Sequence, residues 1–509
     1  MRPTLVRAIV LLAVGTPLTA TCFEMGDVTV SGSNRLEWWL WREKPIGVVI
    51  EKNSEVFDDR FDIDVYYKNL LLGFRYQVVE PSNVLFPGRR EGFYRRYIEY
   101  DSEKFGIRAG NYYVIFGRGL VLRAYEDDII YLDRDMDGVK VRGSTKWADV
   151  VAISGRPRNT EFLQLAYKVI NDTTDVIRGG DLSLHPLPFV TAGASYVLLL
   201  TAKNQFDTSA VSFKRTEVYG TNLCLSIPNI EIYGEIAKKW GWDANLDDPS
   251  VPFNFGGIGQ GYGIYGSVSA SLPGYGITFQ FADYDSIGLG EGSYRYNSPP
   301  ALNRYGQALN KGLDEKGYQI ESYLSPLEPL NIDLSYSHLK TEDEEPLREF
   351  REAFVGVTYR KYGLFDLKAN LDRTEQHEIV EGFTDFNEQI PGLELVYSVT
   401  PVHSVGLGFQ RRAVSGSKEF TDKKLYLMYT FAPYVTVTLT GEQRDEEIED
   451  IQGWEGKEWR SAQIDWDITQ DHRLTLMAGT EKGGLVCSGG ICRYEPPFDG
   501  VKAVLISRF

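Results

Sequence analysis

Apolar and polar residues alternate strictly over many short stretches of this sequence. Residues 365–372 read FDLKANLD and residues 435–440 read VTVTLT, and the same rhythm recurs at 61–67, 331–336 and 462–467. Successive side chains of a β-strand point to opposite faces, so this pattern predicts strands with one apolar and one polar face. The alternation predicts an all-β fold. By itself it fits a soluble sandwich as well as a membrane barrel.

The lengths of the connections separate these two architectures. Tight links lie at 68–69, 145–146, 186–188, 228–229, 273–274, 433–434 and 470–471, and longer polar or glycine-rich links at 43–59, 157–175, 243–260, 286–315 and 483–499. Short and long links take turns along almost the whole chain, as they do in outer-membrane barrels with short periplasmic turns and long external loops. We therefore predict a single large antiparallel transmembrane β-barrel of about 24 strands, within a range of about 20–26.

The two ends of the chain indicate export to the outer membrane. Arg2 and Arg7 flank a basic start, an apolar run follows at 8–14, and small residues lead up to Cys22. This predicts a cleaved signal peptide at 1–22 and a barrel at 23–509, although a buried N-terminal strand is the alternative for the apolar run. At the other end, alternate residues from Val501 to Phe509 share one face and finish on an aromatic ring. That ending resembles the signal read by the barrel-assembly machinery, so we expect this machinery and outer-membrane lipid as partners.

Two motifs resemble one known family. Residues 110–127 read GNYYVIFGRGLVLRAYED, similar to a G-N-x-Y-x-x-F-G-x-G-L-x-L-R-x-Y-E segment, and residues 483–494 read GGLVCSGGICRY, similar to a G-G-L-x-C-x-G-G-x-C-R-Y loop. Both segments are typical of an uncharacterised Gram-negative outer-membrane β-barrel family, a domain of unknown function. The resemblance implies the fold and the compartment, and it implies no activity.

Cysteines and acidic motifs offer little for a metal ion. Cys487 and Cys492 lie in the glycine-rich stretch 483–492. In an exported protein this predicts a local disulfide, since two cysteines without histidines make at most half a zinc site. The stretch 133–138, DRDMDG, imitates the start of a calcium loop, but Ser144 stands where the bidentate Glu should be. We expect no metal and no cofactor.

The segment 117–137 is the main candidate for a functional site. It mixes both signs of charge, in Arg118, Arg123, Glu126, Asp127, Asp128, Asp133, Arg134 and Asp135. If it folds inward, it would narrow the lumen and select solutes by size and charge. The alternative is an external loop whose charges pair with one another and brace the wall.

Two further sets of residues are defined by their positions on the predicted strands. The predicted lumen-facing acids are Asp62, Asp64, Glu231, Glu235, Asp333, Asp366, Asp372, Asp465 and Asp467. They would favour cations, or would simply solvate the inner face and be balanced by arginines. The tryptophans near strand ends are Trp38, Trp39, Trp41, Trp240, Trp242, Trp454, Trp459 and Trp466. We predict a girdle at the lipid headgroups, whereas a sugar-stacking platform would need them inside the lumen.

These observations favour a channel over an enzyme or a nucleic-acid-binding protein. None of the five histidines has a spaced Ser or Asp partner for nucleophilic catalysis, and the net charge of −17 offers phosphate no basic face. A lumen of about 24 strands would be too wide to leave open. We predict a porin-like channel for passive or selective passage of small polar solutes, narrowed by its own loops. The alternative is a non-conducting scaffold or receptor barrel for a surface or periplasmic partner.

Overall fold

The computed structural model describes most of the chain after residue 22. The described ranges are 23–42, 55–80, 90–130, 132–162, 168–172, 175–203, 212–244, 261–290, 295–306, 314–342, 347–361, 363–379, 385–446, 457–488, 491–495 and 497–509. The predicted signal peptide lies outside these residues. Among the described residues, no helix has the length and apolar character needed to cross a membrane.

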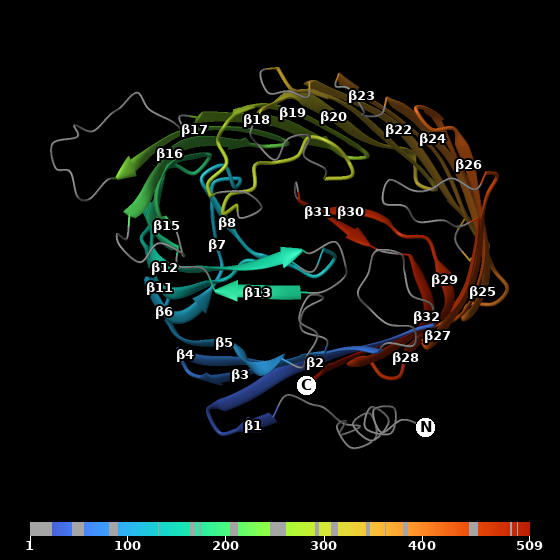
Figure 1. Cartoon of the computed structure of the whole chain (residues 1–509), viewed down its shortest axis with the longest axis horizontal. Helices are drawn as coiled ribbons and strands as arrows, with labels where there is room; N and C mark the ends of the chain where they lie inside the picture. Colours follow the sequence, from blue (N-terminus) through green and yellow to red (C-terminus); the bar gives the residue numbers. More distant parts are fainter. Residues whose placement is uncertain are drawn as a thin grey trace.

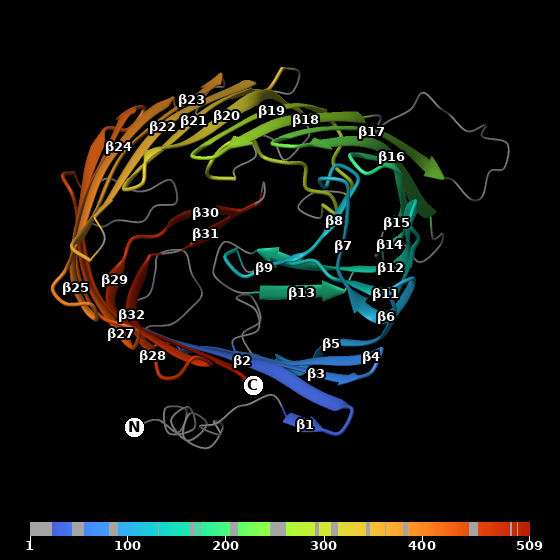
Figure 2. The same cartoon turned by 180° about the vertical axis from the view of Figure 1, so that it is seen from behind.

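The described residues form one closed ring of 24 antiparallel strands, seen from its two ends in Figures 1 and 2. The strands of the ring are β2 (Val28–Trp41), β3 (Glu55–Tyr67), β4 (Leu70–Glu80), β5 (Arg90–Asp101), β6 (Phe105–Tyr112), β11 (Met136–Ser144), β12 (Ala148–Phe162), β14 (Val176–Leu187), β15 (Val190–Lys203), β16 (Ser212–Ile227), β17 (Ile230–Ala244), β18 (Gly261–Leu272), β19 (Tyr275–Asp285), β20 (Asp314–Leu327), β21 (Leu330–Lys340), β22 (Leu347–Lys361), β23 (Phe365–Ile379), β24 (Phe386–Ser398), β25 (His403–Gly416), β26 (Phe420–Phe431), β27 (Val435–Arg444), β28 (Glu458–Asp467), β29 (His472–Glu481) and β32 (Phe498–Arg508). The predicted all-β barrel and its strand number are confirmed.

The ring closes where the last strand pairs with the first. β2 and β32 are antiparallel from Ser33 opposite Arg508 to Trp41 opposite Gly500. At the C-terminus, Phe509 and Gly32 exchange two backbone hydrogen bonds of 2.8 and 3.0 Å, and the Phe509 ring stacks on Phe61 with centroids 5.9 Å apart. The terminal aromatic residue therefore stabilises the junction of the first and last strands of the ring. Its recognition by the assembly machinery stays a prediction.

Two additional strands extend the ring at its edges. β1 (Phe23–Met25) pairs with the start of β2, beyond the reach of β32. β13 (Lys168–Asp172) pairs with the far end of β12, at residues 158–162. Most of the stretch 157–175, predicted as a loop, is therefore strand, and Figures 1 and 2 show this hairpin inside the ring.

Short and long connections alternate around the ring, as predicted. At one end, the turn end, the connections have two to four residues, for example 68–69 between β3 and β4 and 468–471 between β28 and β29. At the other end, the loop end, they reach the length of 286–313 between β19 and β20. Asn229 and Gly274 have φ angles of +67° and +79° at the turn end, which Asn and Gly tolerate best. The predicted turn at 186–188 lies at 188–189 instead, because β14 continues to Leu187.

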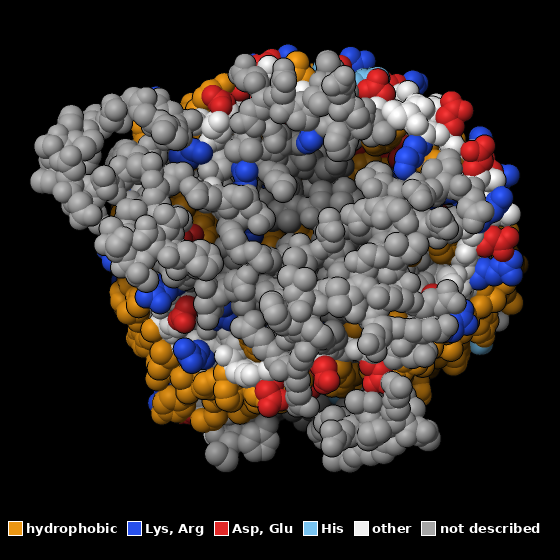
Figure 3. Space-filling model, in the orientation of Figure 1, with side chains coloured by type: hydrophobic (Ala, Val, Ile, Leu, Met, Phe, Trp, Pro, Cys, Tyr) orange, Lys and Arg blue, Asp and Glu red, His pale blue; other side chains and the backbone are white. Residues whose placement is uncertain are grey.

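The outer face of the wall carries an apolar band. On β25–β27 its members are Leu407, Phe409, Leu425, Leu427 and Leu439, each 45–53% exposed. In the space-filling view of Figure 3, hydrophobic side chains edge the ring, and charged ones gather along its right-hand rim. So much apolar surface is costly in water but is buried by a bilayer, which also requires the closed ring. The structure is that of a membrane-spanning barrel.

An arginine on the lipid-facing side should distinguish the two faces of the wall. We expect Leu427→Arg to destabilise the barrel by about 2–4 kcal/mol, since a cation near the middle of the bilayer loses its hydration. Thr438, on the neighbouring strand, faces the lumen cavity, and Thr438→Arg should cost less than about 1 kcal/mol. Urea unfolding in lipid vesicles measures both values. Equal losses would contradict the assignment of the faces.

The two cysteines of the last loop lie in a small hairpin of their own. β30 (Gly484–Ser488) pairs with β31 (Ile491–Glu495), and Cys487 is the register partner of Cys492. The hairpin points into the ring in Figure 1. The side chains of both cysteines lie outside the described residues, so their disulfide stays a prediction.

Candidate functional site

A segment leaves the wall after β6 and lies inside the ring. We call residues 113–135 the first inward segment. β6 and β11 pair directly up to Tyr112 opposite Met136, so the whole segment is inserted between two adjacent strands. It forms two small hairpins, one of β7 (Val114–Phe116) with β8 (Leu122–Ala124) and one of β9 (Glu126–Asp127) with β10 (Leu132–Asp133). Figures 1 and 2 both show β7 and β8 within the ring.

The tip of the first hairpin packs tightly on the inner face of the wall. Leu120, Val121 and Leu122 are fully buried, in one cluster with Val218 of β16 and Tyr265 of β18. Gly220 of β16 makes room for this contact. A Cβ at this position would lie only 2.4 Å from Val121 Cγ2. One side of the lumen is therefore filled by an apolar core and excludes water there.

A buried carboxylate fixes the turn of this hairpin. The amide of Arg118 donates to Glu235 Oε2 of β17 at 2.7 Å, and the Tyr233 hydroxyl donates to the same oxygen at 2.7 Å. Gly117 has a φ of +59°, and a Cβ there would lie 2.3 Å from Glu235 Oε1. Only glycine fits this approach.

A second inward segment, residues 286–306, completes the apolar core. Its described part buries Ile287, Leu289, Tyr296 and Leu302 in the same cluster. Asn297 joins the two segments, because its Nδ2 donates to Leu120 O at 2.7 Å and to Ile287 O at 3.0 Å.

The far end of the second inward segment is anchored to another part of the wall. Tyr305 donates to Asp372 Oδ2 of β23 at 2.7 Å, and Arg304 Nη1 lies 3.2 Å from the same oxygen. The Arg304 amide donates to Glu352 Oε2 of β22 at 3.1 Å. The segment therefore reaches from β19 to β22 and β23 and is held by charge at its end.

A larger side chain at Gly220 should weaken the packing of the first inward segment on the wall. We expect Gly220→Leu to destabilise its packing by about 1–3 kcal/mol, because Val121 is β-branched and has no room to move. Trypsin should then cleave the folded barrel at Arg118 or Arg123 about 5- to 100-fold faster. In the control Gly266→Ala, the new Cβ has only one neighbour within 4 Å, at 3.8 Å, so the cleavage rate should not change. A Gly220→Leu protein cleaved at the wild-type rate would contradict the contact.

An arginine ladder on the wall holds the second hairpin of the first inward segment. Arg60 of β3, Arg75 of β4 and Arg95 of β5 each face the lumen. Arg75 Nη1 and Arg95 Nη2 lie 2.6 Å from the two carboxylate oxygens of Glu126, and Arg60 Nη1 lies 2.8 Å from Asp128 Oδ1. The arginine side chains are 8–15% exposed and that of Glu126 is 20% exposed, so the two ion pairs of Glu126 with Arg75 and Arg95 are only weakly screened by water.

The ladder changes the acidity of Glu126. Burial by itself raises the pKa of this carboxyl, but the charges of Arg75 and Arg95 and the hydrogen bond from Arg75 outweigh it. The pKa therefore lies well below its ordinary value, and Glu126 is ionised at neutral pH.

Most of the remaining candidates of the first inward segment also have partners in the wall or in the segment. Arg118 Nη2 lies 3.3 Å from Glu231, and Arg123 lies over the Tyr125 ring. Asp127 accepts from the Ile129 amide at 2.9 Å, and Tyr113 donates to Asp133 at 2.7 Å. Arg134 and Asp135 are buried, and Asp135 lies 2.9 Å from Arg158.

Most of the predicted lumen-facing acids are also paired. Asp62 contacts Arg75 at 2.7 Å, Asp64 accepts from Tyr97 at 2.7 Å, Asp366 contacts Arg360 at 3.0 Å, Asp465 accepts from Thr475 at 2.8 Å, and Asp467 lies 3.7 Å from Arg473. Glu231, Glu235 and Asp372 hold the inward segments, and Asp333 is exposed.

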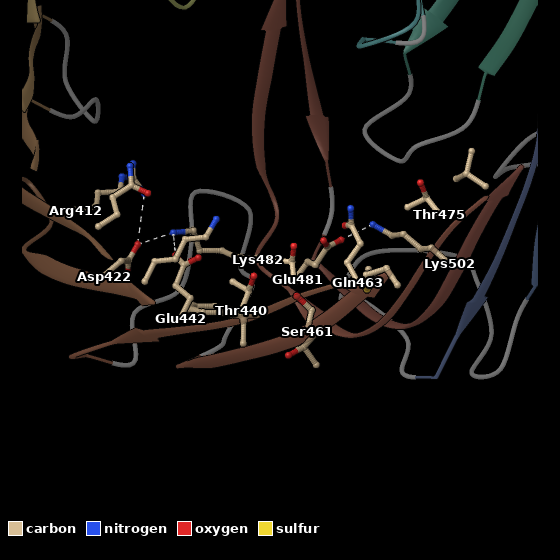
Figure 4. Close-up of a pocket in the computed structure, with 17 residues that line it drawn as sticks. Arg412, Asp422, Thr440, Glu442, Ser461, Gln463, Thr475, Glu481, Lys482 and Lys502 are labelled. Carbon is tan, nitrogen blue, oxygen red and sulfur yellow. Dashed lines mark hydrogen bonds and ion pairs between the residues drawn. The ribbon is translucent and has the colours of Figure 1, made fainter. Parts of the chain in front are cut away.

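A polar cavity of about 710 Å³ lies on the inner face of the wall along β25–β29 and β32 (Figure 4). Thr438, Thr440, Ser461, Gln463 and Thr475 supply hydroxyl and amide groups, beside the ring of Trp459. No described residue of either inward segment lines it. The cavity therefore offers a solute polar contacts on this side of the lumen.

The charges of this cavity neutralise one another. Lys482 reaches both Asp422, at 2.7 Å, and Glu442, while Lys502 contacts Glu481 at 2.6 Å. Figure 4 shows these pairs across the cavity floor, with Arg412 directed toward Asp422. The cavity therefore has no strong field of one sign.

Three of the tryptophans predicted for the headgroup girdle lie elsewhere. Trp39 and Trp41 are 6% and 2% exposed and pack on Phe498, while Trp459 lines the cavity. Their strand positions face inward, which the end of a strand alone does not show. Trp466 is 45% exposed on the outer face, as predicted, whereas Trp454 and the Trp242 side chain lie outside the described residues.

Fold and lumen together define a membrane-spanning β-barrel that is partly filled by its own connections. The chain belongs to the family of unknown function DUF6029, whose model matches residues 5–310 and 357–509. The prediction of an uncharacterised barrel family is thus confirmed, and the two motifs remain a resemblance. No curated protein matches the sequence.

Several solved barrels share the general fold at low identity. The P pilus usher PapC translocation pore is 8% identical, with a TM-score of 0.45 over 94% of this chain and 98% of its own. The copper transporter OprC is 8% identical, with a TM-score of 0.41 over 96% of this chain and 82% of its own. OccK5 (OpdH) of Pseudomonas aeruginosa is 12% identical, with a TM-score of 0.39 over 76% of this chain and 99% of its own. At these scores the likeness carries no argument about function.

Proposed function

We propose that this protein is an outer-membrane channel for small polar solutes, with a lumen narrowed by its own inward segments. The observation that carries the proposal is the division of the lumen. One side is sealed by an apolar core around Leu120 and Ile287, and the other side keeps a polar cavity of about 710 Å³. A barrel that served only as an anchor would have no need of a polar cavity beside a packed seal.

The lining of the cavity indicates which solutes would pass. Hydroxyl and amide groups can replace the hydration of a polar solute, and the lysines are already paired with carboxylates. We therefore expect passage by size and hydrogen bonding, with weak preference for either sign of charge. The first inward segment sets the width in this proposal, but its own charges are bound to the arginine ladder.

The proposal places the turn end in the periplasm and the loop end outside the cell. Outer-membrane lipid would then surround the apolar band, and the assembly machinery would recognise β32 together with Phe509, which follows it. No catalytic step is part of the proposal.

Single-channel recording tests this function directly. Purified, refolded protein in a planar bilayer should give steady current steps in KCl, with a reversal potential close to zero in a salt gradient. Folding is verified independently by the heat-dependent mobility shift of the barrel in gel electrophoresis. A silent bilayer containing folded barrel would reject the channel and favour the non-conducting scaffold.

A further inference from the structure

A small groove interrupts the apolar band on the outer face of the wall. It has a volume of about 290 Å³ and lies where β26, β27 and β28 meet, with Phe409, Leu425 and Arg460 among its lining residues. The groove exists because Gly441 has no side chain, and a Cβ placed there would meet no atom within 4 Å. Leu425 and Arg460 are the register partners of Gly441 on either side.

Two cations meet beside this groove without a carboxylate between them. Arg411 of β25 and Lys423 of β26 are direct register partners, and both are exposed on the outer face. Like charges in directly opposed positions destabilise a strand pair. Among the described residues, neither makes an ion pair of 4.0 Å or less, whereas Arg373, on the same face, is bound to Glu375 at 2.5 Å.

A third cation completes the rim of the groove. Arg460 Nη2 lies 2.8 Å from Glu458, which lines the groove from the outer face. Glu442 also lines the groove, but its carboxylate is paired with a lysine in the lumen. Three cations therefore stand around a single outward carboxylate. The excess positive charge lies directly above the apolar side chains of Phe409 and Leu425, so the groove joins a polar and an apolar half.

The height of these cations matches a headgroup layer. Arg411 and Lys423 stand about eight residues from the turn end of their strands, and a tilted strand rises about 2.6 Å per residue along the barrel axis. The cations then lie roughly 20 Å from the turn end, close to the upper border of an apolar band about 25 Å tall. At this depth a cation meets the phosphate of a lipid rather than its acyl chains.

We propose that Arg411, Lys423 and Arg460 bind the phosphate of a lipid from the leaflet at the loop end, with an acyl chain in the groove over Gly441. The phosphate relieves the repulsion between Arg411 and Lys423, and the chain covers Phe409 and Leu425. This site lies on the outer face and is separate from the lumen cavity. It stands even if the barrel does not conduct.

Lipid titration of the full-length barrel in detergent tests the site, with bound lipid counted by native mass spectrometry. The probe is lipid A that carries its phosphates. The double variant Arg411→Gln/Lys423→Gln should bind it about 30-fold more weakly, since each cation near a headgroup contributes about 1 kcal/mol. Gly441→Phe keeps every charge but fills the groove, and it should also weaken binding.

Matched controls distinguish a bound lipid from a soluble anion. Arg373→Gln removes an exposed arginine from the same face and should leave binding unchanged. Dephosphorylated lipid A should bind the wild type and the double variant equally. Wild-type affinity in both the double variant and Gly441→Phe would overturn the proposal, and so would equal binding of phosphorylated and dephosphorylated lipid A. Full displacement of lipid A by millimolar inorganic phosphate would also overturn it and would assign the cations to a soluble anion instead.

Discussion

Replacing residues 113–135 by a four-residue Gly-Ser turn should raise the single-channel conductance about two- to threefold, because the first inward segment fills much of one side of the lumen. The replacement is feasible, since Tyr112 and Met136 are register partners on adjacent strands and a tight turn can join them. The wall itself keeps all its backbone pairs.

The comparison needs protein that is demonstrably folded. Removal of the segment uncovers apolar wall residues such as Val218 and Leu199, so part of the preparation will fold less efficiently. Only the fraction with the mobility of a folded barrel is recorded, beside Gly266→Ala as a variant with an unaltered lumen. An unchanged conductance would mean that residues 113–135 do not obstruct the path of ions.

Glu126→Gln should have the largest effect of any single substitution in the lumen. It leaves Arg60, Arg75 and Arg95 close together without the carboxylate that contacts all three. Removing the partner of a buried charge costs up to about 3–5 kcal/mol, and Asp128 and Asp62 remain as partners of Arg60 and Arg75. We expect the loss as easier opening of the first inward segment, measured by faster hydrogen exchange at residues 113–135. In the control, Glu458→Gln removes an exposed ion pair with Arg460 and should cost less than about 1 kcal/mol.

The pH dependence of this opening follows from the depressed pKa of Glu126. A carboxyl with a lower pKa in the folded state stabilises that state above its unfolded pKa, and the stabilisation is lost as the pH falls through the folded pKa. Glu126 therefore causes no loss of protection in the wild-type segment between neutral pH and about pH 5. Protection that fell between those values, or a Glu126→Gln protein with wild-type protection, would contradict the role of the ladder.

The barrel was predictable from the sequence because whether a strand residue faces lipid or water depends only on its own position along that strand. Alternation at 365–372 and 435–440 records one face in lipid and one in the lumen, and it requires no knowledge of neighbouring strands. Turn residues such as Asn229 and Gly274 mark the turn end, because a positive φ angle favours these residue types whatever the neighbouring strands are. The hairpin of β12 and β13 escaped prediction because it lies inside the ring and has no lipid-facing side, so alternation is not imposed on it.

The lumen was predictable only in part. The charges of 117–137 drew attention to the segment, but its partners Arg60, Arg75 and Arg95 lie on three strands whose relative heights depend on register. A signal was available, because each of these arginines occupies an inward position and together they match the acids at 126–133. Nothing in the sequence marked Asn297, whose role is to bridge two segments far apart in the chain.

A cysteine at position 438 offers the most direct measurement of a water path beside β27. In a protein whose native cysteines are replaced by serine, Thr438→Cys places a thiol in the cavity, and Leu439→Cys places one on the lipid-facing side. A charged, membrane-impermeant thiol reagent should reduce the current of the Thr438→Cys channel in clear steps and leave Leu439→Cys unaffected. A current that persists unchanged after complete labelling of the Thr438→Cys protein, or a thiol there that never reacts, would contradict the account.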